Sequence, residues 1–125
     1  MDYFEIEGGS TISGHLVPGG NKNEALPVLA ATLLTDQPIL LKNLPQIRDV
    51  AVMLEILESM GATVSRDGSS ARIDNSGLRD VGLPEALCRR IRSSILFAGP
   101  MLARFHRVVL PPPGGDVIGR RRTDT

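Results

Sequence analysis

A glycine-rich turn that leads into a helix is the first group of residues that could do chemistry. Residues 19–23 read Gly-Gly-Asn-Lys-Asn, and the apolar run after them predicts a helix over residues 23–35 with Asn23 as its N-cap. The first N–H groups of a helix have no partners within it and attract anions, and Lys22 adds a full positive charge. The segment matches neither the P-loop nor the dinucleotide-binding pattern. An anion site and an ordinary glycine turn beside a solvated lysine both fit these residues.

A cluster of arginines on a later predicted helix is the second group. Residues 89–94 read Arg-Arg-Ile-Arg-Ser-Ser, on a helix that residues 84–85 (Pro-Glu) would open. Arg89 and Arg92 are three positions apart and are expected to share a helix face. Like charges there cost stability unless an anion or a carboxylate lies opposite. The cluster is therefore either an anion-binding face or a solvated basic stripe.

The third group is a loop with one acid and three arginines. Residues 111–122 read Pro-Pro-Pro-Gly-Gly-Asp-Val-Ile-Gly-Arg-Arg-Arg, so a stiff proline run precedes a glycine-hinged segment that carries Asp116. The planar arginine side chain suits bidentate binding of phosphate or carboxylate. A flexible basic tail is the alternative. Nucleic-acid binding is disfavoured because no aromatic residues interleave with the arginines.

Charge and composition limit the class of protein. The net charge of the 125 residues is zero, but residues 89–122 hold eight arginines against one acid, which favours anionic ligands. Cys88 is the single cysteine, which excludes an internal disulfide and favours a reducing, cytoplasmic location. The first residues lack the basic and apolar regions of a secretory signal. No apolar run of about 18 residues is present, so no membrane span is expected.

Helices and strands are expected to alternate in a mixed α/β (α+β) fold. Residues 48–60 place apolar side chains on one helix face and end at Gly61, as an amphipathic helix does. Asp67 and Gly68 stand between two short alternating runs and predict a hairpin. The expected order is that of a repeated β-α-β-α-β-β unit, one copy whole and a second cut short. The predicted strands are residues 3–7, 10–17, 38–42, 62–66, 69–74 and 107–110, and the third predicted helix, residues 84–102, contains a break at residues 99–100 (Gly-Pro).

In combination, the three groups resemble motifs of the UDP-N-acetylglucosamine enolpyruvyltransferases. Residues 20–27 (Gly-Asn-Lys-Asn-Glu-Ala-Leu-Pro) are similar to the family's G-x-K-N-x-A-L-P segment. Residues 92–105 are similar to its arginine-bearing helix, and residues 113–121 to its P-G-G-[C/D]-x-I-G-x-R loop. The resemblance runs along the whole chain without large gaps. Enolpyruvylshikimate-phosphate synthases share the fold but lack this loop, so they resemble the chain less.

The resemblance implies an activity and a fold. The family transfers the enolpyruvyl group of phosphoenolpyruvate to the 3′-hydroxyl of UDP-N-acetylglucosamine, the committed step of bacterial peptidoglycan synthesis, with no metal and no organic cofactor. Its β-α-β-α-β-β units form inside-out α/β barrel domains. Residues 1–20 would be N-terminal strands that pack with the C-terminal domain, and residues 21–125 a partial first domain.

The resemblance also assigns roles to particular residues. Lys22 and Asn23 would contact phosphoenolpyruvate and the sugar nucleotide, and Arg92 and Arg121 would hold phosphate or carboxylate groups. Asp116 stands where most members have a cysteine that donates a proton, and some an aspartate. Arg122 replaces a proline that often follows the loop arginine, and it is a candidate for a further phosphate contact.

The length of the chain implies that it is only part of a catalyst. Members of the family are about three times longer, and the missing part carries the second wall of the active site. The chain alone is therefore expected to be inactive and to expose apolar surface. The alternative function is a non-catalytic module that binds an anionic ligand or completes a partner chain. Neither nucleic acid nor a membrane is expected as a partner.

Overall fold

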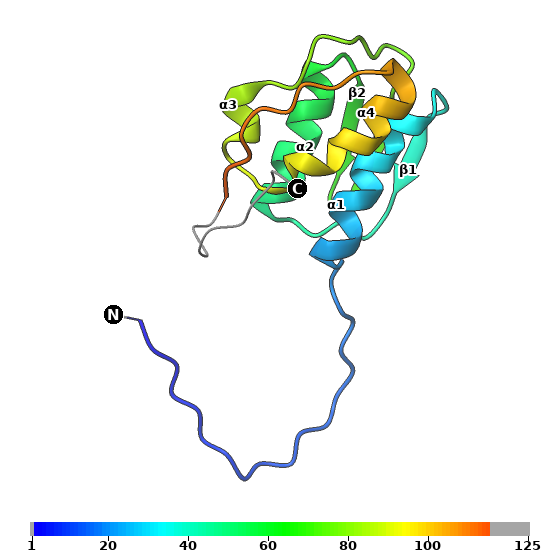
Figure 1. Cartoon of the computed structure of the whole chain (residues 1–125). Coiled ribbons are helices and arrows are strands. Elements are labelled where there is room, and N and C mark those ends of the chain that lie inside the picture. Colours follow the sequence, from blue (N-terminus) through cyan, green and yellow to red (C-terminus); the bar gives the residue numbers. More distant parts are fainter. Residues whose placement is uncertain (1, 116–125) are drawn as a thin grey trace.

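Helices on one face of a small antiparallel sheet form the folded part of the protein (Figure 1). The computed structural model describes residues 2–115. The helices are α1 (Lys22–Ala31), α2 (Arg48–Ser59), α3 (Glu85–Cys88) and α4 (Ala98–Phe105), with 3₁₀ turns η1 (Thr32–Leu34) and η2 (Ser93–Phe97). The strands are β1 (Ile39–Leu41), β2 (Thr63–Asp67) and β3 (Ser70–Asp74).

The sheet confirms the predicted hairpin and the strand before it. Its order is β1-β3-β2, and both pairings are antiparallel, so β3 is the central strand. Asp67 pairs with Ser70, which makes Gly68 and Ser69 the two turn residues. Gly68 has φ of +54°, a conformation that glycine adopts without steric cost at the first position of such turns. The turn therefore lies one residue later than the Asp-Gly pair suggested.

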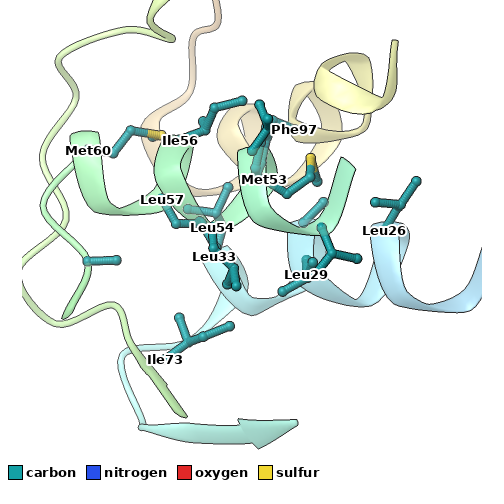
Figure 2. Close-up of a cluster of buried hydrophobic side chains, with 14 of the residues drawn as sticks. Leu26, Leu29, Leu33, Met53, Leu54, Ile56, Leu57, Met60, Ile73 and Phe97 are labelled. Carbon is teal, nitrogen blue, oxygen red and sulfur yellow. The ribbon is translucent and has the colours of Figure 1, made fainter. Parts of the chain in front are cut away.

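The core lies between the sheet and α2. The predicted apolar face of α2 is buried, and Val50, Met53 and Leu57 have no accessible surface. Ile73 of β3 is also fully buried and points from the sheet toward the helices (Figure 2). Leu29 of α1 and Leu33 of η1 are also fully buried. Aliphatic side chains from α1, η1, α2 and β3 therefore form one core.

The N-cap of helix α1 lies two residues earlier than the sequence suggested. Asn21, not Asn23, is the N-cap. Pro27 is tolerated inside the helix, as its sixth residue. The helix tightens into η1 and ends before Thr35, so the predicted span is otherwise matched. Val28 and Leu34 remain partly exposed, as expected for an apolar helix that lacks some of its neighbours.

The third predicted helix breaks earlier than expected. The chain leaves helical geometry between α3 and η2, around residues 89–92, and not at residues 99–100. Pro100 is the third residue of α4, where its missing N–H would have no intrahelical acceptor, so it costs nothing there. His106 ends α4 in the left-handed region, with φ of +58°.

Three of the predicted strands are wrong for the part of the chain that the structure describes. Residues 3–7 and 10–17 lie in an extended, exposed segment that leaves the domain at the start of α1 (Figure 1). Residues 107–110 are also irregular. A strand needs a neighbour to complete its hydrogen bonds, and no neighbouring strand within residues 2–115 pairs with these segments. The observed unit is therefore α-β-α-β-β, without the first strand of the predicted repeat.

Candidate functional site

The start of α1 is organised by its cap. The Asn21 side chain accepts hydrogen bonds from the backbone N–H groups of Asn23 (2.7 Å) and Glu24 (3.3 Å), and the Asn21 carbonyl accepts from Ala25 (3.0 Å). The cap therefore satisfies the N–H groups of Asn23 and Glu24, which the sequence had suggested as possible anion ligands. Lys22 and Asn23 are the first two residues of the helix, so their side chains stand at its positive end.

Lys22 forms an ion pair with Asp49 of α2. The distance from Lys22 Nζ to Asp49 Oδ2 is 2.5 Å. The Lys22 side chain is 52% exposed and the Asp49 side chain 25% exposed. Asp49 lies in the first turn of α2, where an acidic residue is favourable. The pair therefore brings the starts of two helices together at one exposed ammonium group.

Gly20 lies against the backbone at the end of β1. A Cβ atom at this position would lie 1.8 Å from the Asn43 carbonyl oxygen and 2.9 Å from Cδ of Pro45. Asn43 itself has φ of +56°. A side chain at position 20 would force this turn apart, so the glycine fixes where the chain enters α1.

A cavity of about 190 Å³ opens beside this contact. Polar residues (Asn21, Glu24 and Lys42) and apolar residues (Val28 and Leu41) both line it. Its mixed lining lies on the same end of α1 as Lys22. The cavity offers one cation, Lys42, and one acid, Glu24, so it is not a strongly basic pocket.

The arginine cluster does not form the single helix face that its spacing predicted. Helix α3 ends at Cys88, so Arg89 and Arg92 lie on either side of a break. Arg89 pairs with Glu85 (2.6 Å), and Arg90 pairs with Glu55 of α2 (2.7 Å). Arg89 therefore has a carboxylate opposite it, which is the case in which clustered arginines are tolerated without a ligand.

Arg92 is the N-cap of η2, and η2 packs against α1, the helix that Lys22 starts. Phe97 at the other end of η2 has no accessible surface and inserts into the core near Met53 (Figure 2). The tertiary structure thus brings the predicted Arg92 segment and the predicted Lys22 segment onto neighbouring elements.

The proline-glycine segment is tied to the same region. The Gly114 N–H donates to the carbonyl oxygens of Cys88 (3.0 Å) and Ile91 (3.2 Å). A Cβ atom on Gly114 would lie 1.5 Å from the Arg89 carbonyl oxygen, and one on Gly115 would lie 3.0 Å from the Arg92 nitrogen. Residues 111–115 therefore end directly beside Arg92. Asp116, Arg121 and Arg122 lie outside residues 2–115.

Asp49 is the residue of this region that sequence reasoning missed. Its position in the first turn of the predicted helix 48–60 was visible, because acidic residues are common there. Its pairing with Lys22 joins positions 27 residues apart and has no local signal in the sequence.

Three relatives are named UDP-N-acetylglucosamine 1-carboxyvinyltransferase. The protein of Bradyrhizobium diazoefficiens is 51% identical over 98% of this chain and 28% of its own length. The proteins of Treponema denticola and Treponema pallidum are 48% and 50% identical over the whole chain and 30% of theirs. The chain therefore spans less than a third of the length of these relatives.

A solved structure and a family model agree with these similarities. The crystal structure of the enolpyruvyl transferase NikO from Streptomyces tendae matches 78% of this chain and 23% of its own, with a TM-score of 0.66 and 29% identity. The model of the EPSP synthase (3-phosphoshikimate 1-carboxyvinyltransferase) family matches residues 6–124. Because that match covers nearly the whole chain, the protein belongs to the EPSP synthase family.

Proposed function

We propose that this chain is the N-terminal part of an enzyme that transfers the enolpyruvyl group of phosphoenolpyruvate to the 3′-hydroxyl of UDP-N-acetylglucosamine. The observation that carries the proposal is the naming of the relatives, which are 42–51% identical over this chain and share this one activity in their names. The product would enter peptidoglycan synthesis, and with it cell shape and division. We place the enzyme in the cytoplasm, where a lone cysteine stays reduced.

Three side chains of the described region, two of them basic, would bind the substrates. Lys22 and Asn23 at the start of α1 would contact phosphoenolpyruvate and the sugar nucleotide, and Arg92 at the start of η2 would hold a phosphate or carboxylate group. The packing of η2 against α1 supports this assignment, because it makes the two segments parts of neighbouring elements. Fixed cations of this kind position an anionic substrate and stabilise charge that develops during transfer.

The loop that begins beside Arg92 would complete the binding groups. Arg121 would hold a phosphate or carboxylate group, and Arg122 is proposed as a further phosphate contact. Asp116 would donate the proton to the methylene carbon of phosphoenolpyruvate. A proton donor must carry its proton at neutral pH, and nearby phosphate groups favour the neutral carboxylic acid because they repel a second negative charge. The tie of Gly114 to Cys88 and Ile91 supports a role for the loop at this place, because it anchors the loop's first residues.

The part of the enzyme that this chain does not contain would supply the rest of the site. Residues 1–20 would pack with the C-terminal domain, and residues 21–125 would form part of the first domain. The six exposed apolar side chains of the N-terminal segment support this division, because they have no core to join in the described structure: Tyr3, Phe4, Ile6, Ile12, Leu16 and Val17. In the complete enzyme, inside-out barrel domains would close over both substrates.

The test is release of inorganic phosphate from phosphoenolpyruvate by the complete enzyme. We expect release that depends on UDP-N-acetylglucosamine and falls by about a hundredfold or more when Arg121 is replaced by Ala. Phosphate release that depends instead on shikimate 3-phosphate would contradict the choice of acceptor. Saturable binding of the sugar nucleotide without any turnover would contradict the transferase and favour a binding module.

A further inference from the structure

The ion pair between Lys22 and Asp49 joins two helices at their first turns. Lys22 is the first residue of α1, and Asp49 is the second residue of α2. Their charged atoms, Nζ and Oδ2, are 2.5 Å apart. The contact is the described feature that fixes where the Lys22 ammonium lies, since the backbone alone leaves a lysine side chain with several rotatable bonds.

Fold stability does not account for a lysine at this place. The first turn of a helix carries partial positive charge, which favours acidic side chains and disfavours an ammonium group. An ion pair between partly exposed side chains also adds little to stability. Lys22 therefore presents a half-exposed cation at a position that the helix dipole disfavours, and an anion bound beside it would offset that cost.

Asp49 is the more firmly held of the two partners. Val50 and Met53 next to it on α2 are fully buried, which anchors the first turn of that helix in the core. The Asp49 side chain is also half as exposed as the Lys22 side chain. The carboxylate is therefore the more restricted group, and the longer lysine side chain is the one that it aligns.

We propose that Asp49 is a positioning residue that holds the Lys22 ammonium ready for an anionic substrate. The inference rests on the proposed function, in which Lys22 contacts phosphoenolpyruvate. An ammonium group has three N–H donors, and the Asp49 carboxylate needs only one of them. The other donors remain for phosphate or carboxylate oxygens. Because Asp49 already restricts the lysine, less conformational freedom is lost when the substrate binds.

An opposing effect makes the proposal testable. A carboxylate close to an anion site also repels the anion, and this repulsion disappears when the carboxylate is replaced by an amide. If repulsion dominated, Asp49→Asn would tighten the binding of phosphoenolpyruvate. If positioning dominates, the same change weakens binding. The two effects therefore predict opposite signs.

The experiment compares Asp49→Asn and Asp49→Glu with a matched control in the complete enzyme. Glu55→Gln is the control because it breaks the Arg90–Glu55 pair, a similar ion pair on the same helix that lies outside the proposed site. We expect Asp49→Asn to lower kcat/KM for phosphoenolpyruvate by about tenfold to a hundredfold. Asp49→Glu should recover part of the loss, and Glu55→Gln should stay within about twofold of the wild type.

A double-mutant cycle and a binding measurement decide between the outcomes. Adding Asp49→Asn to Lys22→Met should cause no further loss, because a positioning residue acts only through the group it positions. An unchanged or raised kcat/KM in Asp49→Asn, or losses that add in the double variant, would overturn the proposal. If the wild-type enzyme releases no phosphate, the proposed function fails by itself. Calorimetric titration of phosphoenolpyruvate into the wild type and Asp49→Asn then tests positioning, and equal or absent binding in both refutes it.

Discussion

Two glycines near the candidate site lie so close to another backbone segment that no larger residue fits. Gly20 and Gly114 both lie where a Cβ atom would overlap a backbone carbonyl oxygen. Backbone atoms cannot move aside as a flexible side chain can, so any larger residue at these positions must displace a whole segment. These two glycines hold the entry to α1 and the proline-glycine segment in place.

Gly20→Ala should destabilise the fold by about 1–3 kcal/mol, because the added methyl group would lie 1.8 Å from the Asn43 carbonyl oxygen. Urea unfolding measures the loss. Gly19→Ala is the matched control, since nothing lies within 4 Å of a Cβ atom there, and it should change stability by less than about 0.5 kcal/mol. Equal effects of the two substitutions would show that the close approach to Asn43 is unimportant.

Asp74 should make a pH-dependent contribution to stability. The Ser76 hydroxyl and backbone N–H donate to its carboxylate at 2.6 Å and 3.0 Å, and these hydrogen bonds lower the pKa of Asp74 below its ordinary value of 3.8. A lowered pKa means that this stabilisation is present above pH 3.8 and is lost as the pH falls through the folded-state value. Asp74→Asn should therefore lower the melting temperature at neutral pH and have little effect in strong acid. A difference that does not change with pH would contradict this.

Cys88 should be unreactive in the native protein. Its side chain is fully buried, and burial raises the pKa of its thiol, so little of the reactive thiolate forms at neutral pH. We expect iodoacetamide to label Cys88 slowly in buffer and rapidly in urea, as measured by mass spectrometry.

Mass spectrometry after treatment with an epoxide tests the loop residue Asp116. A carboxylate cannot form the thioether that a loop cysteine forms, so an epoxide that inactivates cysteine-loop members should not inactivate the complete enzyme. Covalent labelling at Asp116 would contradict this prediction.

At the scale of elements, η2 shows how a short irregular segment can be fixed by a single side chain. Phe97 is the largest fully buried residue of the described chain, and it anchors a segment of only five residues, whose N-cap is Arg92. A 3₁₀ turn has poorer hydrogen-bond geometry than an α-helix and depends on such packing. The position of Arg92 therefore depends on the core beneath it.

Phe97→Ala should cost about 3–5 kcal/mol of stability, because it removes a buried ring and leaves a cavity. Chemical denaturation measures the cost. Leu96→Ala, at the neighbouring position of the same turn, removes a side chain that is 38% exposed and should cost clearly less, about 1–2 kcal/mol. If both substitutions cost the same, packing of η2 by Phe97 would not be what holds the segment.

At the scale of the whole molecule, the described structure has a complete small core and an incomplete surface. Buried aliphatic residues from α1, α2 and β3 pack together. Separately, no helix within residues 2–115 is long and apolar enough to span a membrane. Tyr3, Phe4 and Ile12 nevertheless stand in solvent, each more than four-fifths exposed. Exposed apolar side chains of this kind are typical of surfaces that pack against a partner.

The purified 125-residue chain should show no turnover of phosphoenolpyruvate and UDP-N-acetylglucosamine, because it spans less than a third of the length of its relatives. A coupled phosphate-release assay measures this, with the complete enzyme as the positive control. Turnover by the short chain above the uncatalysed rate would refute the prediction and would place all essential groups within these residues.

The sequence by itself determined the features that depend on near neighbours. The amphipathic helix α2, the hairpin of β2 and β3 and the strand β1 were all predicted, because their apolar periods and turn residues lie within a few positions of one another. The motifs at residues 20–27, 92–105 and 113–121 also indicated the UDP-N-acetylglucosamine enolpyruvyltransferases. Relatives of that name, 48–51% identical over at least 98% of this chain, confirm the resemblance, and the match to the EPSP synthase family over residues 6–124 agrees with it. The roles of Lys22, Asn23, Arg92, Asp116, Arg121 and Arg122 stay predictions.

Only the tertiary structure decided which distant groups meet. It paired Lys22 with Asp49, placed the segment of Arg92 against α1 and tied Gly114 to the end of α3. It also decided that residues 3–7, 10–17 and 107–110 are not strands in this chain. The physical reason is the same in each case: a strand, an ion pair or a backbone contact between distant positions needs a partner, and a local pattern does not contain that partner.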